Sequence, residues 1–244
     1  ASNERDKEFY KPYATIMDLE ATYRLGAVLS LGPRVELHHQ AIKHTQDGGL
    51  LQSGTVSGTA PETVLGLGVA LIRDTRTDRF YPEQGIYTRL AVMDFEHLDG
   101  DTYHFWWLEC DVRHYRRVGD NHVLAGQFYG NVIDGDAPFW RLPSLGYREH
   151  SWAYDRDRYL DKLLLAGQAQ WRWRPFLRWG FSVSSGVATV ASSPSRLQGK
   201  YLRPYVGVGA RFFVERDGKL VPIRGDLGVG HRNWRVTVGI GEIF

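Results

Sequence analysis

The chain has 244 residues and a formal net charge of +2, a length that suits a single domain. It has no block of Lys or Arg, so its charge pattern excludes a basic nucleic-acid footprint. Its longest apolar run, Val64 to Ile72, is about half the roughly 18 residues that a membrane-spanning helix needs. The lone Cys110 excludes an intrachain disulfide.

Apolar and polar residues alternate with a period of two along most of the chain, a pattern that predicts β-strands. No segment of helix length repeats with a period of 3.6 residues. Two strands are expected within residues 7–31. The others, in chain order, are expected at 34–43, 64–74, 86–95, 102–115, 122–131, 162–173, 176–190, 201–214, 220–229 and 234–244. These are about 12 strands of roughly ten residues, the length that crosses a bilayer when tilted.

Each of the clearer strands has one apolar face and one polar face. In residues 201–214 the even positions include Val206 and Val208, while the odd positions include Arg203 and Arg211. The charged faces also contain many glycines, which suits a crowded interior. The fold class predicted is therefore all-β, a transmembrane antiparallel β-barrel with its apolar face toward lipid. The alternative is a soluble sandwich or lipocalin-like barrel, which would turn its apolar face inward.

Two connections between the predicted strands are long. Residues 45–62 are rich in Gly, Ser, Thr and Gln and are expected to form a flexible loop. Residues 132–159 are too aromatic for simple disorder, and loops of this length are usually functional. We expect this second segment to be an ordered lid loop that folds over or into the barrel.

Five segments in order resemble the bacterial surface antigen family, the barrels of the outer-membrane assembly and two-partner-secretion transporter superfamily (BamA-like and TamA-like proteins). The turn 74–87 resembles the family's D-x-R-D…F-Y-P-x-x-G motif. Gly146, Tyr147 and Arg148 resemble its lid motif. Residues 168–172 and 223–228 resemble its E-Y/W-R and R-x-D-x-G strands, and 239–244 resembles its terminal strand. The matches span about three quarters of the chain.

The resemblance implies an integral protein of the Gram-negative outer membrane, with residues 1–244 as a single barrel and 1–9 as a periplasmic tail. Both termini would lie on the periplasmic side, so the number of strands would be even, and 12 are expected. We therefore expect a barrel-only member of the family, without periplasmic POTRA domains. Phe244 would be the C-terminal signal read by the barrel assembly machinery. The other expected partners are outer-membrane lipid and a second copy in a homo-oligomer, with no nucleic acid.

The chain departs from the family where the lid is latched. The family's lid arginine falls on Leu145, and its two acidic partners fall on Gln170 and Ser184. Losing one member of such a set would leave a buried charge unpaired, whereas losing all three is electrostatically consistent. Either Arg148 holds the lid through Glu109, Asp111 or Asp226, or the lid is mobile or displaced.

The predicted function is a channel or an accessory factor in membrane protein or lipid assembly or transport. The alternative is a lipid-modifying enzyme, although the chain has no G-x-S-x-G, C-x-x-C or H-E-x-x-H motif and no cofactor or metal is expected. The interior charges are read either as salt bridges that fill the barrel or as the lining of a solute path. They are Glu109, Asp111, Arg113, Arg172, Arg203, Arg211 and Asp226.

Overall fold

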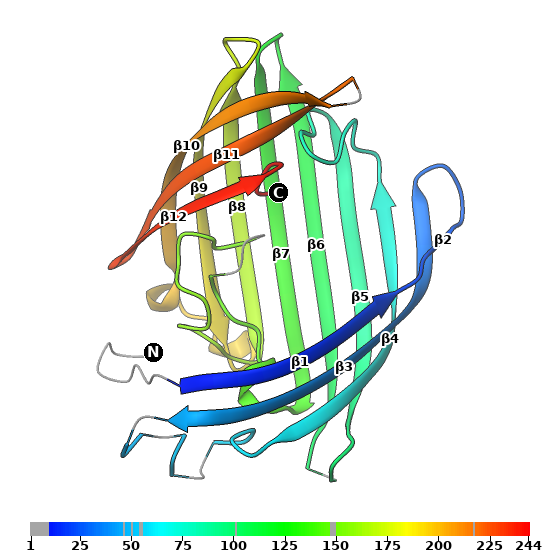
Figure 1. Cartoon of the computed structure of the whole chain (residues 1–244), viewed down its shortest axis with the longest axis vertical. Coiled ribbons are helices and arrows are strands. Elements are labelled where there is room, and N and C mark those ends of the chain that lie inside the picture. Colours follow the sequence, from blue (N-terminus) through cyan, green and yellow to red (C-terminus); the bar gives the residue numbers. More distant parts are fainter. Residues whose placement is uncertain are drawn as a thin grey trace.

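The computed structural model describes residues 10–45, 47–49, 51–53, 56–100, 102–146, 150–216 and 218–244. They form one sheet that curls round on itself, so that its first and last strands lie near each other across a gap (Figure 1). The strands are β1 (Tyr10–Glu20), β2 (Tyr23–Arg24), β3 (Leu29–Thr45), β4 (Glu62–Asp74), β5 (Gly85–His97), β6 (His104–Val118), β7 (His122–Asp136), β8 (Leu163–Trp173), β9 (Trp179–Ala191), β10 (Arg203–Arg216), β11 (Lys219–Gly230) and β12 (Asn233–Ile240). In the described part of the chain, no helix has the length and apolar character needed to cross a membrane.

The all-β class and the twelve strands predicted from the sequence are confirmed, but the N-terminal strands differ from expectation. β2 has only two residues and pairs with β3 in the register that β1 has already set, Glu20 opposite Arg34 and Tyr23 opposite Leu31. β1 and β2 are thus one strand interrupted at residues 21–22. The carbonyl of Ala21 lies against Gly32, where no side chain could fit.

Because β2 continues β1, the sheet is a path of eleven antiparallel neighbours from β1 through β3 to β12. In a path of eleven, the first and last strands run in the same direction. The expectation that the strand path begins and ends on one side of the molecule is therefore wrong for the described residues. The sheet is also not closed, since β1 pairs only with β3 and β12 only with β11. The expected tail at 1–9 lies outside the described residues.

The two faces of the sheet have the polarity that the sequence predicts. On the convex face, Val206 and Val208 are 59% and 55% exposed, and similar apolar residues occupy the convex face of the neighbouring strands. On the concave face, Arg172, Arg211 and Arg224 are almost completely buried. Charged side chains are almost never fully buried without partners, and Arg211 and Arg224 have carboxylate partners here.

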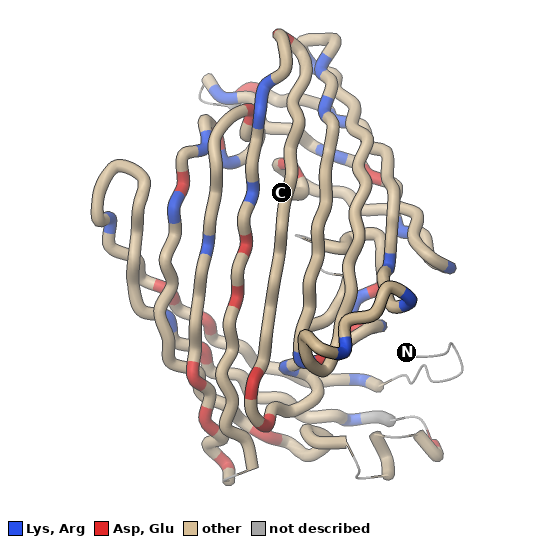
Figure 2. The backbone as a smooth tube through the Cα atoms, turned by 180° about the vertical axis from the view of Figure 1, so that it is seen from behind, with Lys and Arg blue, Asp and Glu red and all other residues tan. Residues whose placement is uncertain are grey.

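The connections give the two ends of the sheet different characters. One end, which we call the turn end, has the connections 25–28, 75–84, 119–121, 174–178 and 217–218. The other, the loop end, has the connections 46–61, 98–103, 137–162, 192–202 and 231–232. Seen from behind, acidic residues of the nearer strands gather toward the loop end, whereas basic residues are spread along the whole length of the molecule (Figure 2).

Candidate functional site

The connection 137–162 enters the hollow of the sheet, and we call it the inner loop. It starts later than the predicted 132–159 because β7 continues to Asp136. Its Trp152 is 1% exposed, and the six-membered ring of this side chain lies against two concave-face glycines. A Cβ atom at Gly207 or Gly228 would come within 2.6 Å of the Trp152 ring. These glycines therefore create the space that the loop occupies.

Hydrogen bonds from the last strands hold the centre of the inner loop. Arg235 on β12 donates through Nη1 to the carbonyl oxygens of Gly146 (2.9 Å) and Tyr154 (3.0 Å). Asn233 Nδ2 donates to the carbonyl oxygen of Ala153 at 2.9 Å. The Tyr154 hydroxyl donates to the carbonyl oxygen of Pro204 at 2.6 Å. The loop is thus fixed to β12 through its backbone carbonyls and to β10 through the side chain of Tyr154.

The beginning of the inner loop is anchored on the opposite wall. Arg141 donates to Glu36 Oε1 on β3 at 2.7 Å, and its guanidinium lies 4.5 Å from the centre of the Phe95 ring. The Trp140 ring lies 4.4 Å from the ring of His38. The inner loop therefore contacts both walls of the hollow.

The residues that resemble the family's lid motif lie in this loop, and the structure describes the first of them, Gly146. Gly146 has φ +93°, and a Cβ there would clash with the backbone of Asp155. Tyr147 and Arg148 lie outside the described residues, so the proposed pairing of Arg148 stays a prediction. Each of the three candidate carboxylates already forms an ion pair with another arginine. Glu109 binds Arg89, Asp111 binds Arg113, and Asp226 binds Arg211 and Arg224.

The three positions at which the sequence departs from the resembled family, Leu145, Gln170 and Ser184, are held by packing and by hydrogen bonds. Leu145 is fully buried in an apolar cluster that includes Trp152 and Phe244. Gln170 Oε1 accepts a hydrogen bond from Arg172 Nε at 2.7 Å. Ser184 donates a long bond of 3.4 Å to the carbonyl oxygen of Gly207. Apolar packing thus surrounds Leu145.

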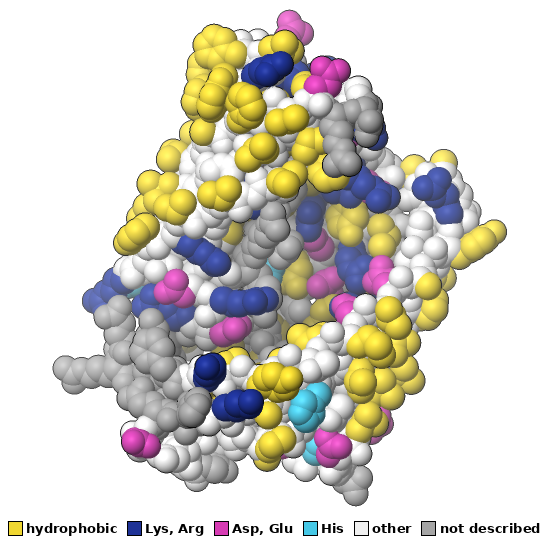
Figure 3. All heavy atoms as spheres, in the orientation of Figure 1, with side chains coloured by type: hydrophobic (Ala, Val, Ile, Leu, Met, Phe, Trp, Pro, Cys, Tyr) yellow, Lys and Arg dark blue, Asp and Glu magenta, His cyan; other side chains and the backbone are white. Residues whose placement is uncertain are grey.

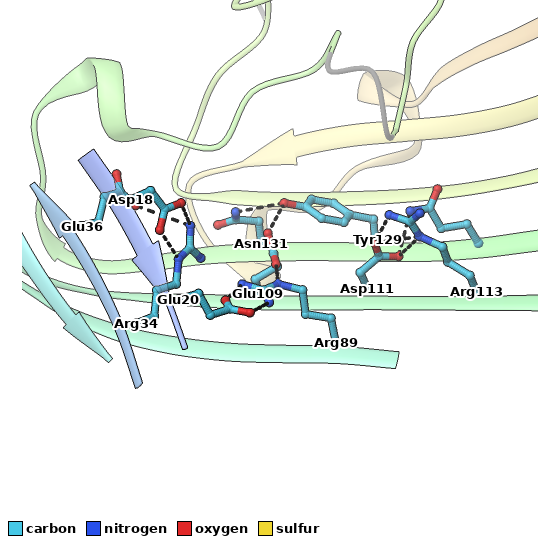
Figure 4. Close-up of polar contacts among 11 residues, drawn as sticks. Asp18, Glu20, Arg34, Glu36, Arg89, Glu109, Asp111, Arg113, Tyr129 and Asn131 are labelled. Carbon is cyan, nitrogen blue, oxygen red and sulfur yellow. Dashed lines mark hydrogen bonds and ion pairs between the residues drawn. The ribbon is translucent and has the colours of Figure 1, made fainter. Parts of the chain in front are cut away.

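A ladder of paired charges follows the concave face of β1, β3, β5 and β6 (Figure 4). Arg34 bonds Asp18 through two nitrogens, at 3.0 and 2.7 Å. Arg89 bridges Glu20 (2.7 Å) and Glu109 (2.8 Å). The ladder continues with a hydrogen bond from the Tyr129 hydroxyl to Glu109 Oε2 at 3.0 Å. These acids and arginines alternate, so each charge has an opposite neighbour.

The C-terminal residues 241–244, which we call the C-terminal tail, lie inside the sheet. Glu242 of this tail forms a second charged cluster with arginines of the strands. The last strand was predicted to run to Phe244, but it ends at Ile240, and that part of the prediction is wrong. Gly241, at φ +80°, turns the chain inward, and its amide donates to the carbonyl oxygen of Pro222 at 2.8 Å. Phe244 is consequently 3% exposed on the concave side rather than on the apolar convex face.

Glu242 is the polar centre of this tail. It accepts from Arg211 Nη2 at 2.8 Å and lies 3.7 Å from Arg172 Nε, and all three side chains are 1% exposed. Arg172 also donates to the carbonyl oxygen of Phe244 at 2.8 Å. Burial raises the pKa of Glu242, but the neighbouring charges of Arg172 and Arg211 lower it by more. The net pKa is therefore below its usual value. The carboxylate is therefore held in its charged form.

The inner loop also contains the pair of residues most like a catalytic one. His150 Nδ1 lies 3.1 Å from Ser151 Oγ, and Ser151 has the strained φ of +47°. However, Ser151 is completely buried, and its Oγ also accepts the amide of Gly146. Burial lowers the pKa of His150 to about 4, too low for an efficient base at neutral pH.

One group of side chains on the convex face has the composition of a cation site. Asp94, Glu96 and His104 each offer a ligand atom within 4.8 Å of the others. Glu96 and His104 are exposed, and His104 Nε2 already lies 3.1 Å from Asp94. Exposed acidic groups of this kind are common without an ion.

The seven predicted interior charges all come from concave-face positions of their strands. Glu109 belongs to the ladder, Asp111 and Arg113 form a separate ion pair on the same face of β6, and Arg172, Arg211 and Asp226 belong to the cluster around the tail. Arg203 stands apart, with its guanidinium 4.7 Å from the centre of the Tyr159 ring. The prediction missed Asp18, Glu20, Arg34, Glu36, Arg89, Arg141, Arg224, Arg235 and Glu242.

The missed residues divide by whether a signal for them existed. Arg89 and Arg224 occupy the same strand faces as predicted neighbours, so alternation alone could have found them. Glu242 had a misleading signal, because it continues the even-numbered positions of the apolar face of β12. Only the turn at Gly241 reverses it. The sequence matches no protein-family model and no curated protein sequence.

Proposed function

We propose that this chain forms most of the wall of an integral outer-membrane β-barrel of the surface antigen type, which acts in transport or assembly across that membrane. The observation that carries the proposal is the inverted polarity of the sheet. Its convex face exposes large apolar side chains, while buried, paired charges fill its concave face. A lipid-facing sheet requires this arrangement, since charged residues on the lipid side are costly.

Aromatic residues at the turn end support the membrane placement. His122, Trp171 and Trp173 stack on the convex side of β7 and β8, and Phe181 lies 6.0 Å from Trp173. Trp179 packs on Phe212 beside them. Such belts are typical of membrane interfaces, where the rings contact both the headgroups and the apolar core. The membrane surface would then cross the sheet near these residues.

The inner loop has the position of a lid over the path through the sheet. Figure 3 shows the molecule hollowed between β12 and β1, with basic and acidic side chains on the walls of the hollow. The inner loop crosses this hollow and is fixed to both walls. We infer a gated passage rather than an open pore. The lipid-modifying enzyme gains no support, because Ser151 is inaccessible.

A pair of valine substitutions tests the membrane placement. Val208 lies in the middle of β10 and Val118 at the end of β6, both on the convex face and exposed. In a bilayer, Val208→Arg should destabilise the folded protein by about 2–4 kcal/mol and Val118→Arg by about 0–1 kcal/mol. Urea unfolding in lipid vesicles measures both.

The contrast between the two variants decides the outcome. If the convex face is exposed to water, both substitutions should be nearly neutral, and equal small effects would refute the proposal. Conductance across a planar bilayer then separates transport from assembly. Arg235→Met should raise the conductance of a gated passage, since it removes two hydrogen bonds that hold the inner loop.

A further inference from the structure

A cavity of about 380 Å³ lies at the loop end, between the inner loop and the connection 192–202. Its size falls within the range of small-ligand sites. Three arginines line it, Arg158 from the inner loop, Arg196 from the connection and Arg203 from β10. The single carboxylate in the lining is Asp161, so the formal charge of the cavity is positive.

The arginines are arranged in a way that suits an anion. The Tyr159 ring has the Arg158 guanidinium 5.4 Å and the Arg203 guanidinium 4.7 Å from its centre. Arg203 Nε is buried and has no hydrogen-bond partner among the described residues. An arginine side chain cannot lose its charge to relieve this state. A buried donor of this kind costs free energy until an acceptor reaches it.

A second cavity, of about 320 Å³, adjoins the first and has the opposite character. It is lined mainly by apolar side chains of the convex face, among them Phe128, Leu165 and Val187, and Leu197 and Leu202 complete it. Its walls therefore come from the surface that the proposed function places in lipid.

Gln198 lines both cavities. The connection 192–202 thus has an apolar cavity on its lipid side and a basic cavity on its inner side. The two cavities meet at Gln198. A ligand that fills both must have an apolar chain and an anionic group at one end. Arginine binds phosphate through paired charge-assisted hydrogen bonds. A lipid headgroup without a net negative charge should bind the three arginines less tightly.

We propose that these two adjoining cavities, which we call the rim site, bind a phosphate-bearing anionic lipid, with its acyl chain in the apolar cavity and its phosphate at Arg196 and Arg203. The proposal rests on the membrane placement under the proposed function. It adds to that placement a specific contact with one class of lipid, at the end of the sheet that carries the inner loop. Because Arg158 belongs to that loop, an occupied site would also restrain the loop.

The test uses the full chain in a neutral detergent, with a short-chain phosphatidylglycerol as the probe and binding measured by titration calorimetry. Short-chain phosphatidylcholine and inorganic phosphate are the comparison ligands. We expect saturable binding of one phosphatidylglycerol, at least tenfold tighter than either comparison ligand. Arg196→Gln, at an exposed side chain, should weaken this binding about tenfold. Arg203→Gln should weaken it further.

Arg178→Gln is the matched control, since Arg178 is exposed at the turn end, far from the site along β9. It should leave the affinity unchanged. Equal affinity for phosphatidylglycerol and phosphatidylcholine would overturn the proposal, as would unchanged binding by the Arg196→Gln protein. Equal binding of inorganic phosphate would also overturn it, by identifying a site for a free anion.

Failure of this proposal can be told apart from failure of the membrane placement. Reconstitution into vesicles of phosphatidylcholine alone measures insertion without the anionic lipid. A protein that inserts there but shows no preference for phosphatidylglycerol loses only the rim site. A protein that does not insert loses the proposed function as well.

Discussion

Glu242 offers the sharpest test of how the interior is held together. Its carboxylate accepts from Arg211 Nη2 at 2.8 Å and from Arg211 Nε at 3.1 and 3.3 Å, and it lies 3.7 Å from Arg172. Glu242→Gln keeps the shape of the side chain but removes its charge. The cluster of Arg172, Arg211 and Arg224 would then have Asp226 as its only remaining side-chain carboxylate among these contacts.

The expected cost follows from what the arginines keep. Breaking a buried ion pair by removing one partner typically costs about 3–5 kcal/mol. Arg211 keeps Asp226 at 2.6 Å, and glutamine keeps one acceptor oxygen, so the cost should be lower. We expect Glu242→Gln to reduce the free energy of unfolding by about 2–3 kcal/mol. The C-terminal tail should also become accessible to carboxypeptidase.

Urea unfolding of the protein in lipid vesicles measures the change, with Glu215→Gln as the control. Glu215 is exposed on the same strand as Arg211, and its substitution should change stability by less than about 0.5 kcal/mol. A Glu242→Gln protein as stable as wild type, with its tail still protected, would refute the role given to this charge. A double-mutant cycle with Arg211→Met should give a coupling free energy of at least about 1 kcal/mol.

Three further predictions concern the inner loop and its seat. Gly228→Ala should cost about 1–3 kcal/mol, because the new Cβ meets Trp152 at 2.6 Å, whereas Gly225→Ala, with open space around it on the same strand, should be nearly neutral in the same unfolding assay. His150 has a pKa of about 4 in the folded protein against an ordinary 6.5, so its contribution to the free energy of unfolding is complete above pH 6.5 and falls by roughly 3 kcal/mol as the pH drops to 4. His150→Gln should flatten this part of the stability–pH curve, and an unchanged curve would contradict the lowered pKa of His150. Arg235→Met should expose the inner loop to limited proteolysis while leaving strand content, followed by circular dichroism, unchanged.

Strand positions and face polarity could be read from the sequence because both depend on local alternation. A period of two needs only neighbouring residues, and in β10 it assigns Val208 outward and Arg211 inward without reference to the rest of the chain. The same rule places Arg203 on the concave face but does not show that Tyr159 lies beside it. That contact joins residues from two distant segments.

Features that depend on a single backbone turn could not be read in this way. One positive φ, at Gly241, moves Glu242 and Phe244 from the predicted outer face to the interior. The interruption at residues 21–22 similarly looks like a chain reversal in the sequence, but the chain resumes in the same direction along β3. In both cases the side chains alternate regularly up to the turn or the interruption. The alternation therefore does not predict either feature.

The shared direction of β1 and β12 has a consequence of parity. Paired strands in an antiparallel ladder alternate in direction, so two edges that point the same way can be joined by such ladders only through an odd number of further strands. Direct contact between the two edges, or any even number of inserted strands, would leave one parallel seam. A second copy in the same membrane orientation would meet this one, β1 against β12, along parallel seams as well. Because the two-residue strand β2 continues β1 in the same direction, it restricts every assembly that could complete the wall.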